Sequence, residues 1–132
     1  MSDPTPSAAL RVLVVDDNRD AADSLAILLD LWGHQTRLAY DGHSGLREAL
    51  AFRPHVAFLD VMMPGLSGPE VARRLRQGPG LERTVLVALT ATEPDDPRLD
   101  GHLGAFDHYL KKPYSLEALE GLLSDCAART TA

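Results

Sequence analysis

Cysteine is nearly absent from this sequence, since Cys126 is the only one among 132 residues. A disulfide framework within the chain is therefore excluded, and a reducing compartment suits the composition. No apolar run approaches the roughly 20 residues of a membrane-spanning helix. The amino-terminal MSDPTPSAA also lacks the basic and apolar regions of a secretory signal. We therefore expect a cytoplasmic protein that does not enter a membrane.

Positive charge is also scarce. The chain has 13 Lys and Arg against 19 Asp and Glu, a net charge of -6, which is not the footprint of a nucleic-acid-binding protein. The glycine-rich signatures GxGxxG and GxxxxGK[ST] are missing, so dinucleotide and P-loop sites are not indicated. The histidines show no metal-ligand spacing, and we interpret four of them as surface or edge residues: His34, His43, His102 and His108.

Near-continuous apolar runs are what the sequence does contain. Such runs are typical of parallel strands buried on both faces of a sheet. Mixed runs, in contrast, suit strands at the sheet edges. The buried candidates are Leu10–Val15, His55–Leu59 and Thr84–Leu89, and the edge candidates are Thr36–Tyr40 and Phe106–Leu110.

Helical patterns separate these runs. Asp20–Trp32 is expected to bury Ala21, Leu25, Leu28 and Trp32, and Ser44–Phe52 to bury Leu46, Ala49 and Leu50. Ser67 and Glu70 have the spacing of a capping box before Val71–Arg76, whose arginines Arg73, Arg74 and Arg76 would cover an exposed side. A last helix, capped by Ser115, would bury Leu116, Leu119, Leu122, Leu123 and Cys126. Glu93–Leu103 is ambiguous because its prolines shorten any helix.

The alternation of strand and helix, repeated five times, predicts one α/β domain with a doubly wound, five-stranded parallel sheet. We expect the (βα)5 flavodoxin-like strand order 2-1-3-4-5. The domain would span residues 10–128, between a disordered lead of residues 1–9 and a disordered tail of residues 129–132.

Polar groups collect at the carboxyl ends of these strands, where open α/β sheets bind their ligands. Asp16 and Asp17 follow the first strand, and FLDVMMPGLSG places Asp60 at the end of an apolar run. The remaining strand ends contribute Thr90 and Lys112. Three close carboxylates repel one another unless a cation binds them, and oxygen ligands suit Mg²⁺ (or Mn²⁺) better than Zn²⁺. Carboxylates, Mg²⁺, a lysine and a hydroxyl suit a transferring phosphoryl group, with Asp60 as nucleophile.

The segments VLVVDDN, FLDVMMPGLSG, VALTA and DHYLKKP resemble, in order and spacing, the signatures of the response-regulator receiver domain of two-component signalling. This resemblance covers nearly the whole chain. It implies a phosphorylation-dependent switch that takes a phosphoryl group from a histidine kinase or phosphotransfer protein. Its output would be protein contact through the face made by 93–103, the Phe106–Leu110 strand and the last helix, in a monomer or weak homodimer. The protein would be no enzyme beyond catalysing its own phosphorylation and dephosphorylation.

The resemblance also implies roles for individual residues. Asp60 resembles the phosphoacceptor, Asp17 the direct Mg²⁺ ligand and Asp16 the acid that acts mainly through metal-bound water. Met62 would offer its backbone carbonyl to the metal. Thr90, with Ala91 after it, resembles the hydroxyl position that turns towards the phosphate, Lys112 the lysine that pairs with it and Tyr109 the switch aromatic. The Lys112–Pro113 peptide bond is commonly cis in this family.

Other interpretations stay open at this point. Asp16 and Asp17 alone could be a helix cap, and Met62 and Met63 could simply pack. The chain could be a stand-alone receiver, a receiver excised from a hybrid histidine kinase, or a phosphate-independent pseudo-receiver. A haloacid-dehalogenase-type phosphohydrolase would need a second aspartate at the position of Met62.

Overall fold

The computed structural model describes residues 9–91 and 104–131, with side chains up to residue 128. One five-stranded sheet with the order β2-β1-β3-β4-β5 runs through its centre, and every pairing is parallel. The predicted α/β class and strand order are therefore confirmed. The strands are β1 (Arg11–Val15), β2 (Gln35–Ala39), β3 (Val56–Asp60), β4 (Val85–Thr90) and β5 (His108–Lys111).

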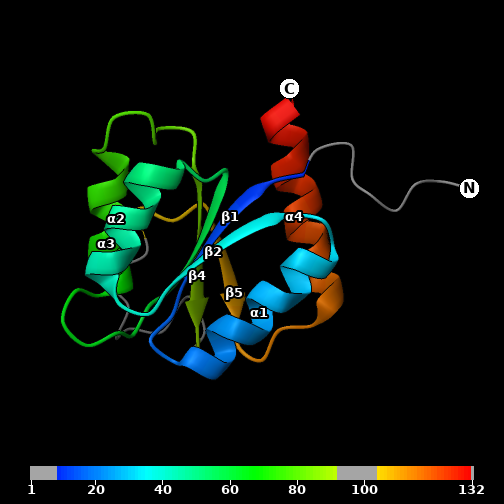
Figure 1. Cartoon of the computed structure of the whole chain (residues 1–132), viewed down its shortest axis with the longest axis horizontal. Coiled ribbons are helices and arrows are strands. Elements are labelled where there is room, and N and C mark those ends of the chain that lie inside the picture. The colour runs from blue at the N-terminus through cyan, green and yellow to red at the C-terminus, as the bar shows by residue number, and fades with distance from the viewer. Residues whose placement is uncertain (1–8, 92–103, 132) are drawn as a thin grey trace, which may run out of the picture.

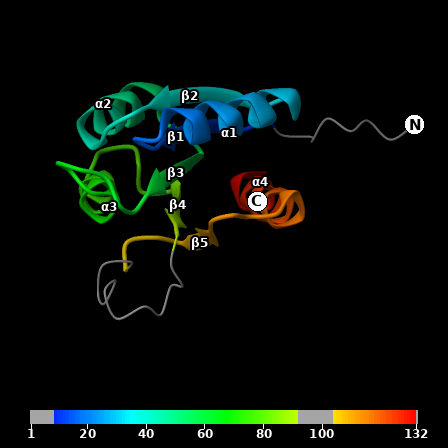
Figure 2. The same cartoon turned by 90° about the horizontal axis from the view of Figure 1, so that it is seen from below.

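Helices cover both faces of this sheet, as Figures 1 and 2 show: α2 and α3 lie on one face, α1 and α4 on the other. Their bounds are α1 (Arg19–Leu31), α2 (Gly42–Phe52), α3 (Gly68–Arg76) and α4 (Leu116–Thr131). The ambiguous segment Glu93–Leu103 lies outside the described residues. Helix α4 extends past residue 128, where the sequence predicted the domain to end.

Two apolar layers explain the continuous hydrophobic runs. Successive strand side chains point to opposite faces, so Leu13 and Leu59 pack under α2 and α3, whereas Val14 and Phe58 pack under α1 and α4. All four side chains are fully buried. A strand that is buried on both faces needs apolar side chains at nearly every position, which accounts for runs that do not alternate.

Three predicted helix faces need correction. Helix α1 buries Ala22, Leu25, Ala26 and Leu29, a stripe turned by one residue from the predicted one. Of the predicted residues, Leu25 is buried, and Leu28 and Trp32 are partly buried against the same core. Leu50 of α2 and Leu116 of α4 are half exposed, although both were predicted to point inwards. The rest of the α4 prediction is confirmed, because Leu119, Leu122, Leu123 and Cys126 are buried.

Capping side chains fix where the helices begin. Asn18 caps α1 by accepting from the backbone N–H of Ala21 at 3.1 Å, so neither Asp16 nor Asp17 is the cap. Ser67 caps α3 with the predicted capping-box partner Glu70, and the Ser115 hydroxyl accepts from the N–H of Ala118 at 3.0 Å. Such caps stabilise a helix by about 1 kcal/mol each.

Arg76 does not cover an exposed side of α3, as the sequence had suggested. Its guanidinium donates to the carbonyl of Thr84 at 2.8 Å and to that of Ala105 at 3.2 Å, and it pairs with the carboxylate of Asp107. Asp107 also accepts from the backbone N–H of Leu86 at 2.8 Å. This Arg76–Asp107 clamp joins α3 to the amino ends of β4 and β5.

His34 is buried rather than at the surface, which corrects another prediction. Its Nδ1 accepts from the backbone N–H of Leu10 at 3.1 Å. At the start of the sheet the ring therefore serves as the acceptor that a neighbouring strand would otherwise provide. A buried N–H without an acceptor would be costly. Burial also lowers the pKa of His34 below its usual value, which favours the neutral ring that this hydrogen bond needs.

Candidate functional site

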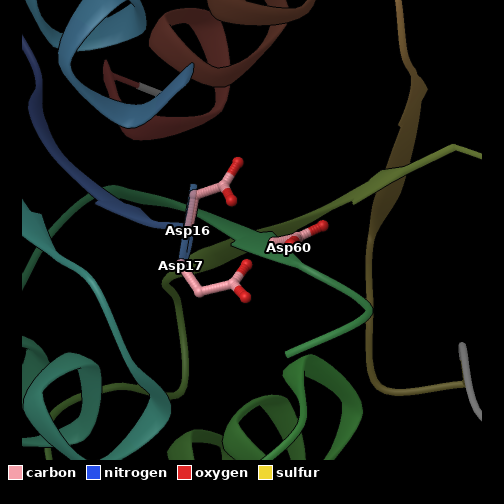
Figure 3. A group of neighbouring side chains, drawn as sticks. All are labelled: Asp16, Asp17 and Asp60. Atoms are coloured by element: carbon pink, nitrogen blue, oxygen red, sulfur yellow. The ribbon is translucent and has the colours of Figure 1, made fainter. Parts of the chain in front are cut away.

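The parallel pairing of β1 and β3 brings three aspartates together at one edge of the sheet. Val15 pairs with Leu59, so Asp16 and Asp60 follow side by side. Oxygen atoms from Asp16, Asp17 and Asp60 all lie within 4.8 Å of one another. Figure 3 shows the three carboxyl groups leaving the ends of β1 and β3 on the same side of the strands.

Asp16 is the most enclosed member of this group, with 1% of its surface exposed. One carboxylate oxygen accepts from the backbone N–H of Asn18 at 2.9 Å, and the other lies 2.9 Å from Nζ of Lys112. Its own N–H donates to the carbonyl of Ala39 at 3.1 Å. A buried charge needs compensation, and here the Asn18 N–H and the Lys112 ammonium group provide it.

Lys112 enters the site from the end of β5. Its backbone N–H donates to the carbonyl of Thr90 at 2.7 Å, and the Lys112–Pro113 peptide bond is cis. The ammonium group also lies 3.6 Å from Oδ1 of Asp60. Burial alone would lower the pKa of Lys112, but its hydrogen bond to Asp16 and the charges of Asp16 and Asp60 raise it overall. Lys112 therefore stays positively charged among the carboxylates.

Asp60 has the most perturbed carboxyl group in the site. Burial has the largest effect on the pKa of Asp60, and the charge of Asp16 has the next largest. Together they outweigh the attraction of Lys112 and raise this pKa to about 7. One lysine does not neutralise three carboxylates, so the ionised site carries excess negative charge. Perturbed carboxyl groups of this kind gather at functional sites.

A glycine that the sequence reading did not single out shapes the other side of Asp60. A Cβ added at Gly68 would lie 2.2 Å from the backbone oxygen of Asp60, so the start of α3 packs directly on the end of β3. Gly68 N–H also donates to the carbonyl of Val61 at 3.3 Å. A glycine placed just inside a helix, where it is a poor helix former, is the signal that could have revealed this approach.

The remaining predicted residues surround this centre at different depths. Thr90 is the last residue of β4, 1% exposed, and adjoins Lys112 through its carbonyl. Ala91 is exposed directly after it. Tyr109 in β5 is 43% exposed, and the side chain of Met62 is 74% exposed, so packing is the wrong interpretation for Met62. Met63, in contrast, is buried in the core.

The acidic group fits a divalent cation of the Mg²⁺ type. Its donors are all carboxylate oxygens, which hard cations prefer. Burial first, and then the charge of Asp16, raise the pKa of Asp60, and a positive charge among the carboxylates would relieve their mutual repulsion. Asp16, Asp17 and Asp60 form the one such group of three or more acidic, histidine or cysteine residues found within residues 9–91 and 104–131. The same stretches contain no helix long and apolar enough to cross a bilayer.

Fold and site together define a doubly wound α/β domain with three aspartates at one edge of its five-stranded parallel sheet. Comparison with known proteins identifies its family. The response regulator receiver domain model matches residues 12–124. The response regulator MprA of Mycobacterium tuberculosis is 41% identical over 122 residues, which are 92% of this chain and 52% of that protein. MprA of Mycobacterium ulcerans is 40% identical over the same length. The chain spans about half the length of the curated relatives it matches.

Solved structures agree with the sequence matches. One is the receiver domain of the sensor histidine kinase PA1611 from Pseudomonas aeruginosa, which holds a magnesium ion in its active site cleft. It is 28% identical to this chain and has a TM-score of 0.81, over 89% of this chain and 97% of that one. The chemotaxis protein CheY4 of Vibrio cholerae is 29% identical and has a TM-score of 0.79, over 90% of this chain and 99% of that one. The chain belongs to the response regulator receiver domain family of two-component signalling.

Membership of this family settles the class of function. Receiver domains are signalling domains rather than classical enzymes, and they interact with histidine kinases or phosphotransfer proteins. The acidic site is consistent with phosphorylation-dependent switching, and nothing in the comparisons supports a phosphohydrolase or a phosphate-independent module.

Proposed function

We propose that Asp60 accepts the phosphoryl group of this receiver domain. The observation that carries the proposal is the arrangement around its carboxylate. Oxygens of Asp16 and Asp17 lie within 4.8 Å of those of Asp60, and the ammonium group of Lys112 lies 3.6 Å from Oδ1 of Asp60. Asp60 alone of the three acids ends a strand of the sheet.

In the proposed step, an Asp60 oxygen forms a bond to phosphorus while the phosphorus–nitrogen bond of a phosphohistidine breaks. The imidazole leaves with the electron pair, and an acyl phosphate remains on Asp60. Only the ionised carboxylate can attack, so groups that favour ionisation promote the step. Lys112 is one of them, because its charge lowers the pKa of Asp60. Mg²⁺ (or Mn²⁺), held by Asp16, Asp17, Asp60 and the backbone carbonyl of Met62, would supply the positive charge that offsets the carboxylates and the phosphoryl oxygens.

The new phosphate would then rearrange the residues beside it. Lys112 would exchange part of its attraction to Asp16 for the phosphoryl oxygens, and the Thr90 hydroxyl, next to Ala91, would turn towards them. Tyr109, now 43% exposed, would turn inwards and change the surface that β5 and α4 present. This is a shift between two populations, driven by one local change of charge.

The proposed partners follow from this chemistry. A histidine kinase or phosphotransfer protein would deliver the phosphoryl group, and a target protein would read the surface that includes β5 and α4. Hydrolysis of the acyl phosphate, promoted by the domain itself, would reset the state. A cytoplasmic location suits these partners and a sequence whose single cysteine, Cys126, is buried.

The test is phosphorylation by a small donor. Purified protein is incubated with Mg²⁺ and acetyl phosphate or phosphoramidate, and its intact mass is measured beside Asp60→Asn. We expect one phosphoryl group on the wild type, removed by hydroxylamine, and none on the variant. Equal phosphorylation of Asp60→Asn would overturn the assignment, and failure to bind Mg²⁺ or accept phosphate from either donor or a histidine phosphotransfer protein would overturn the function.

A further inference from the structure

A second polar cavity lies at the opposite edge of the sheet from the acidic site. It has a volume of about 510 Å³ and is bounded by the amino ends of β1, β3 and β4 and by the loop between α3 and β4. Arg11, Arg53 and Arg83 line it, together with His55. Volumes of about 300–1,000 Å³ are typical of pockets for small molecules.

Two of the arginines lie close against the backbone. Arg11 donates from Nε and Nη2 to the carbonyl of Arg53, at 3.1 and 2.8 Å. Arg53 ends α2 with a left-handed backbone, φ 51°, and its guanidinium lies across Gly80, where an added Cβ would come within 2.8 Å of Nη1. Gly80 itself has a φ of 82° and leaves room for this side chain.

These cations lack acidic partners. Within the part of the chain that the structure describes, neither Arg53 nor Arg83 forms an ion pair. Glu82, the carboxylate that lines the cavity, instead accepts from the backbone N–H of Gly80 at 3.0 Å. Three arginines against one glutamate therefore make a positive pocket on a chain whose net charge is -6.

His55 adds a neutral donor to the same wall. Its Nδ1 accepts from the backbone N–H of Arg11 at 2.9 Å, so Nε2 carries the ring proton. Burial first, and then the charge of Arg11, lower the pKa of His55. The residue is therefore a hydrogen-bond donor, rather than a fourth cation, at neutral pH.

We propose that this cavity binds a small molecule that carries a phosphate or diphosphate group. Planar guanidinium groups bind phosphate oxygens with paired, charge-assisted hydrogen bonds, and the arginines gathered here have donors that the protein does not use. The cavity is much larger than a phosphate ion, so the organic part of a phosphorylated ligand would fill the rest. Arg53 and Arg83 would hold the phosphate, and His55 would donate one further hydrogen bond.

Isothermal titration calorimetry with pyrophosphate and with ADP tests the proposal. The protein carries Asp60→Asn and the buffer contains EDTA, so that neither a phosphorylated Asp60 nor a metal at the acidic site can take up the ligand. The test variant is Arg53→Gly with Arg83→Gln, since glycine suits the left-handed backbone at position 53. The matched control is Arg73→Gln with Arg74→Gln, which removes the same charge from exposed positions of α3.

We expect saturable binding of at least one of the two ligands, weakened about tenfold or more by the cavity variant, because the variant removes charge-assisted hydrogen bonds to the phosphate. The control variant should change the dissociation constant less than about twofold. Arg83→Gln alone, at an exposed position that leaves the fold intact, should also weaken binding. Absence of saturable binding of both ligands at millimolar concentration, or equal weakening by the control variant, would overturn the proposal.

Discussion

Lys112 lies closer to Asp16 than to Asp60: its ammonium nitrogen is 2.9 Å from an Asp16 oxygen and 3.6 Å from one of Asp60. The closer partner is also the more deeply buried one, with a side chain only 1% exposed. Lys112 thus compensates the acid that water reaches least. Asp60, the proposed phosphoacceptor, is left with the larger share of the unbalanced negative charge.

Lys112→Gln should therefore destabilise the metal-free protein and strengthen Mg²⁺ binding. The buried Asp16 carboxylate would lose its partner, at a cost of about 1–3 kcal/mol in the free energy of unfolding. A cation that no longer competes with the lysine would bind more tightly. Urea unfolding with and without Mg²⁺, and calorimetric titration of Mg²⁺, measure both effects. Lys111→Gln removes the same charge from an exposed neighbour, and an equal loss of stability there would contradict the argument.

Asp60→Asn should stabilise the metal-free protein above neutral pH. The folded-state pKa of Asp60 is raised from 3.8 to about 7, so the folded state binds this proton more tightly than the unfolded state does. Ionisation of Asp60 therefore costs stability, beginning above about pH 4 and reaching its full extent above about pH 7.

The gain from Asp60→Asn should be on the order of 1–2 kcal/mol at pH 8 and much smaller at pH 4.5. Urea unfolding in EDTA at the two pH values measures it. Adding Mg²⁺ should stabilise the wild type more than the variant. The same gain at both pH values would show that repulsion among the carboxylates is not the cause.

His34 should make the domain sensitive to mild acid. Burial lowers its folded-state pKa below the usual 6.5, so the unfolded state takes up the proton first. The stability that neutral His34 contributes is complete above about pH 6.5 and declines as the pH falls through that value towards the folded-state pKa. Protonation of Nδ1 would also remove the acceptor for the N–H of Leu10.

His34→Asn should reduce this dependence, because the Asn oxygen can accept the same hydrogen bond and does not titrate. The measurement is the free energy of unfolding at pH 7.5 and 5.5. The variant should lose less stability between these values than the wild type, although His55, whose pKa is also lowered, titrates in both proteins. Equal losses of stability in the wild type and the variant would show that His34 does not cause the acid sensitivity.

Gly68→Ala should damage both the fold and the site. The new Cβ would fall 2.2 Å from the backbone oxygen of Asp60, so β3 and α3 must separate, at a cost of about 2–4 kcal/mol. Phosphorylation by acetyl phosphate should slow, since Asp60 would move with its backbone. Gly121→Ala in α4 is the control, because its added Cβ would meet nothing within 4 Å. This variant should raise the free energy of unfolding by about 0.5–1 kcal/mol. Wild-type stability and phosphorylation in Gly68→Ala would refute this reading of the contact.

The sequence predicted the order of the elements because each buried strand is apolar throughout and each is followed by a helical pattern. The bounds were less accurate: β3 and β4 each include the polar residue, Asp60 or Thr90, that the prediction placed after the strand. The backbone of a strand can pair with its neighbour at a residue whose side chain is polar, and a hydrophobicity pattern does not detect this pairing. The α1 face was placed one residue off because apolar residues lie on both neighbouring stripes. Ala21, Leu28 and Trp32 are on the predicted stripe, and Ala22, Ala26 and Leu29 are on the observed one.

The residues that meet in the acidic site could also be predicted from the sequence, because parallel strands bring their carboxyl ends to one edge of the sheet. Which acid Lys112 contacts more closely depends on distances between segments 96 positions apart, and no pattern encodes those. The closeness of Gly68 to Asp60 and the burial of His34 are likewise properties of the assembled layers. They follow from where the helix and the strand meet, after both have formed.

The Arg76–Asp107 clamp has a mechanical consequence. It fastens the amino ends of β4 and β5 to α3, while the other end of β5 leads into Lys112 in the acidic site. A shift of Lys112 would therefore act on a short strand whose far end is anchored and which is paired to β4 from His108 to Lys111. Tyr109 lies between the anchor and Lys112, so under the proposed switch β5 is the segment that would connect a charge change at the acidic site to this aromatic ring.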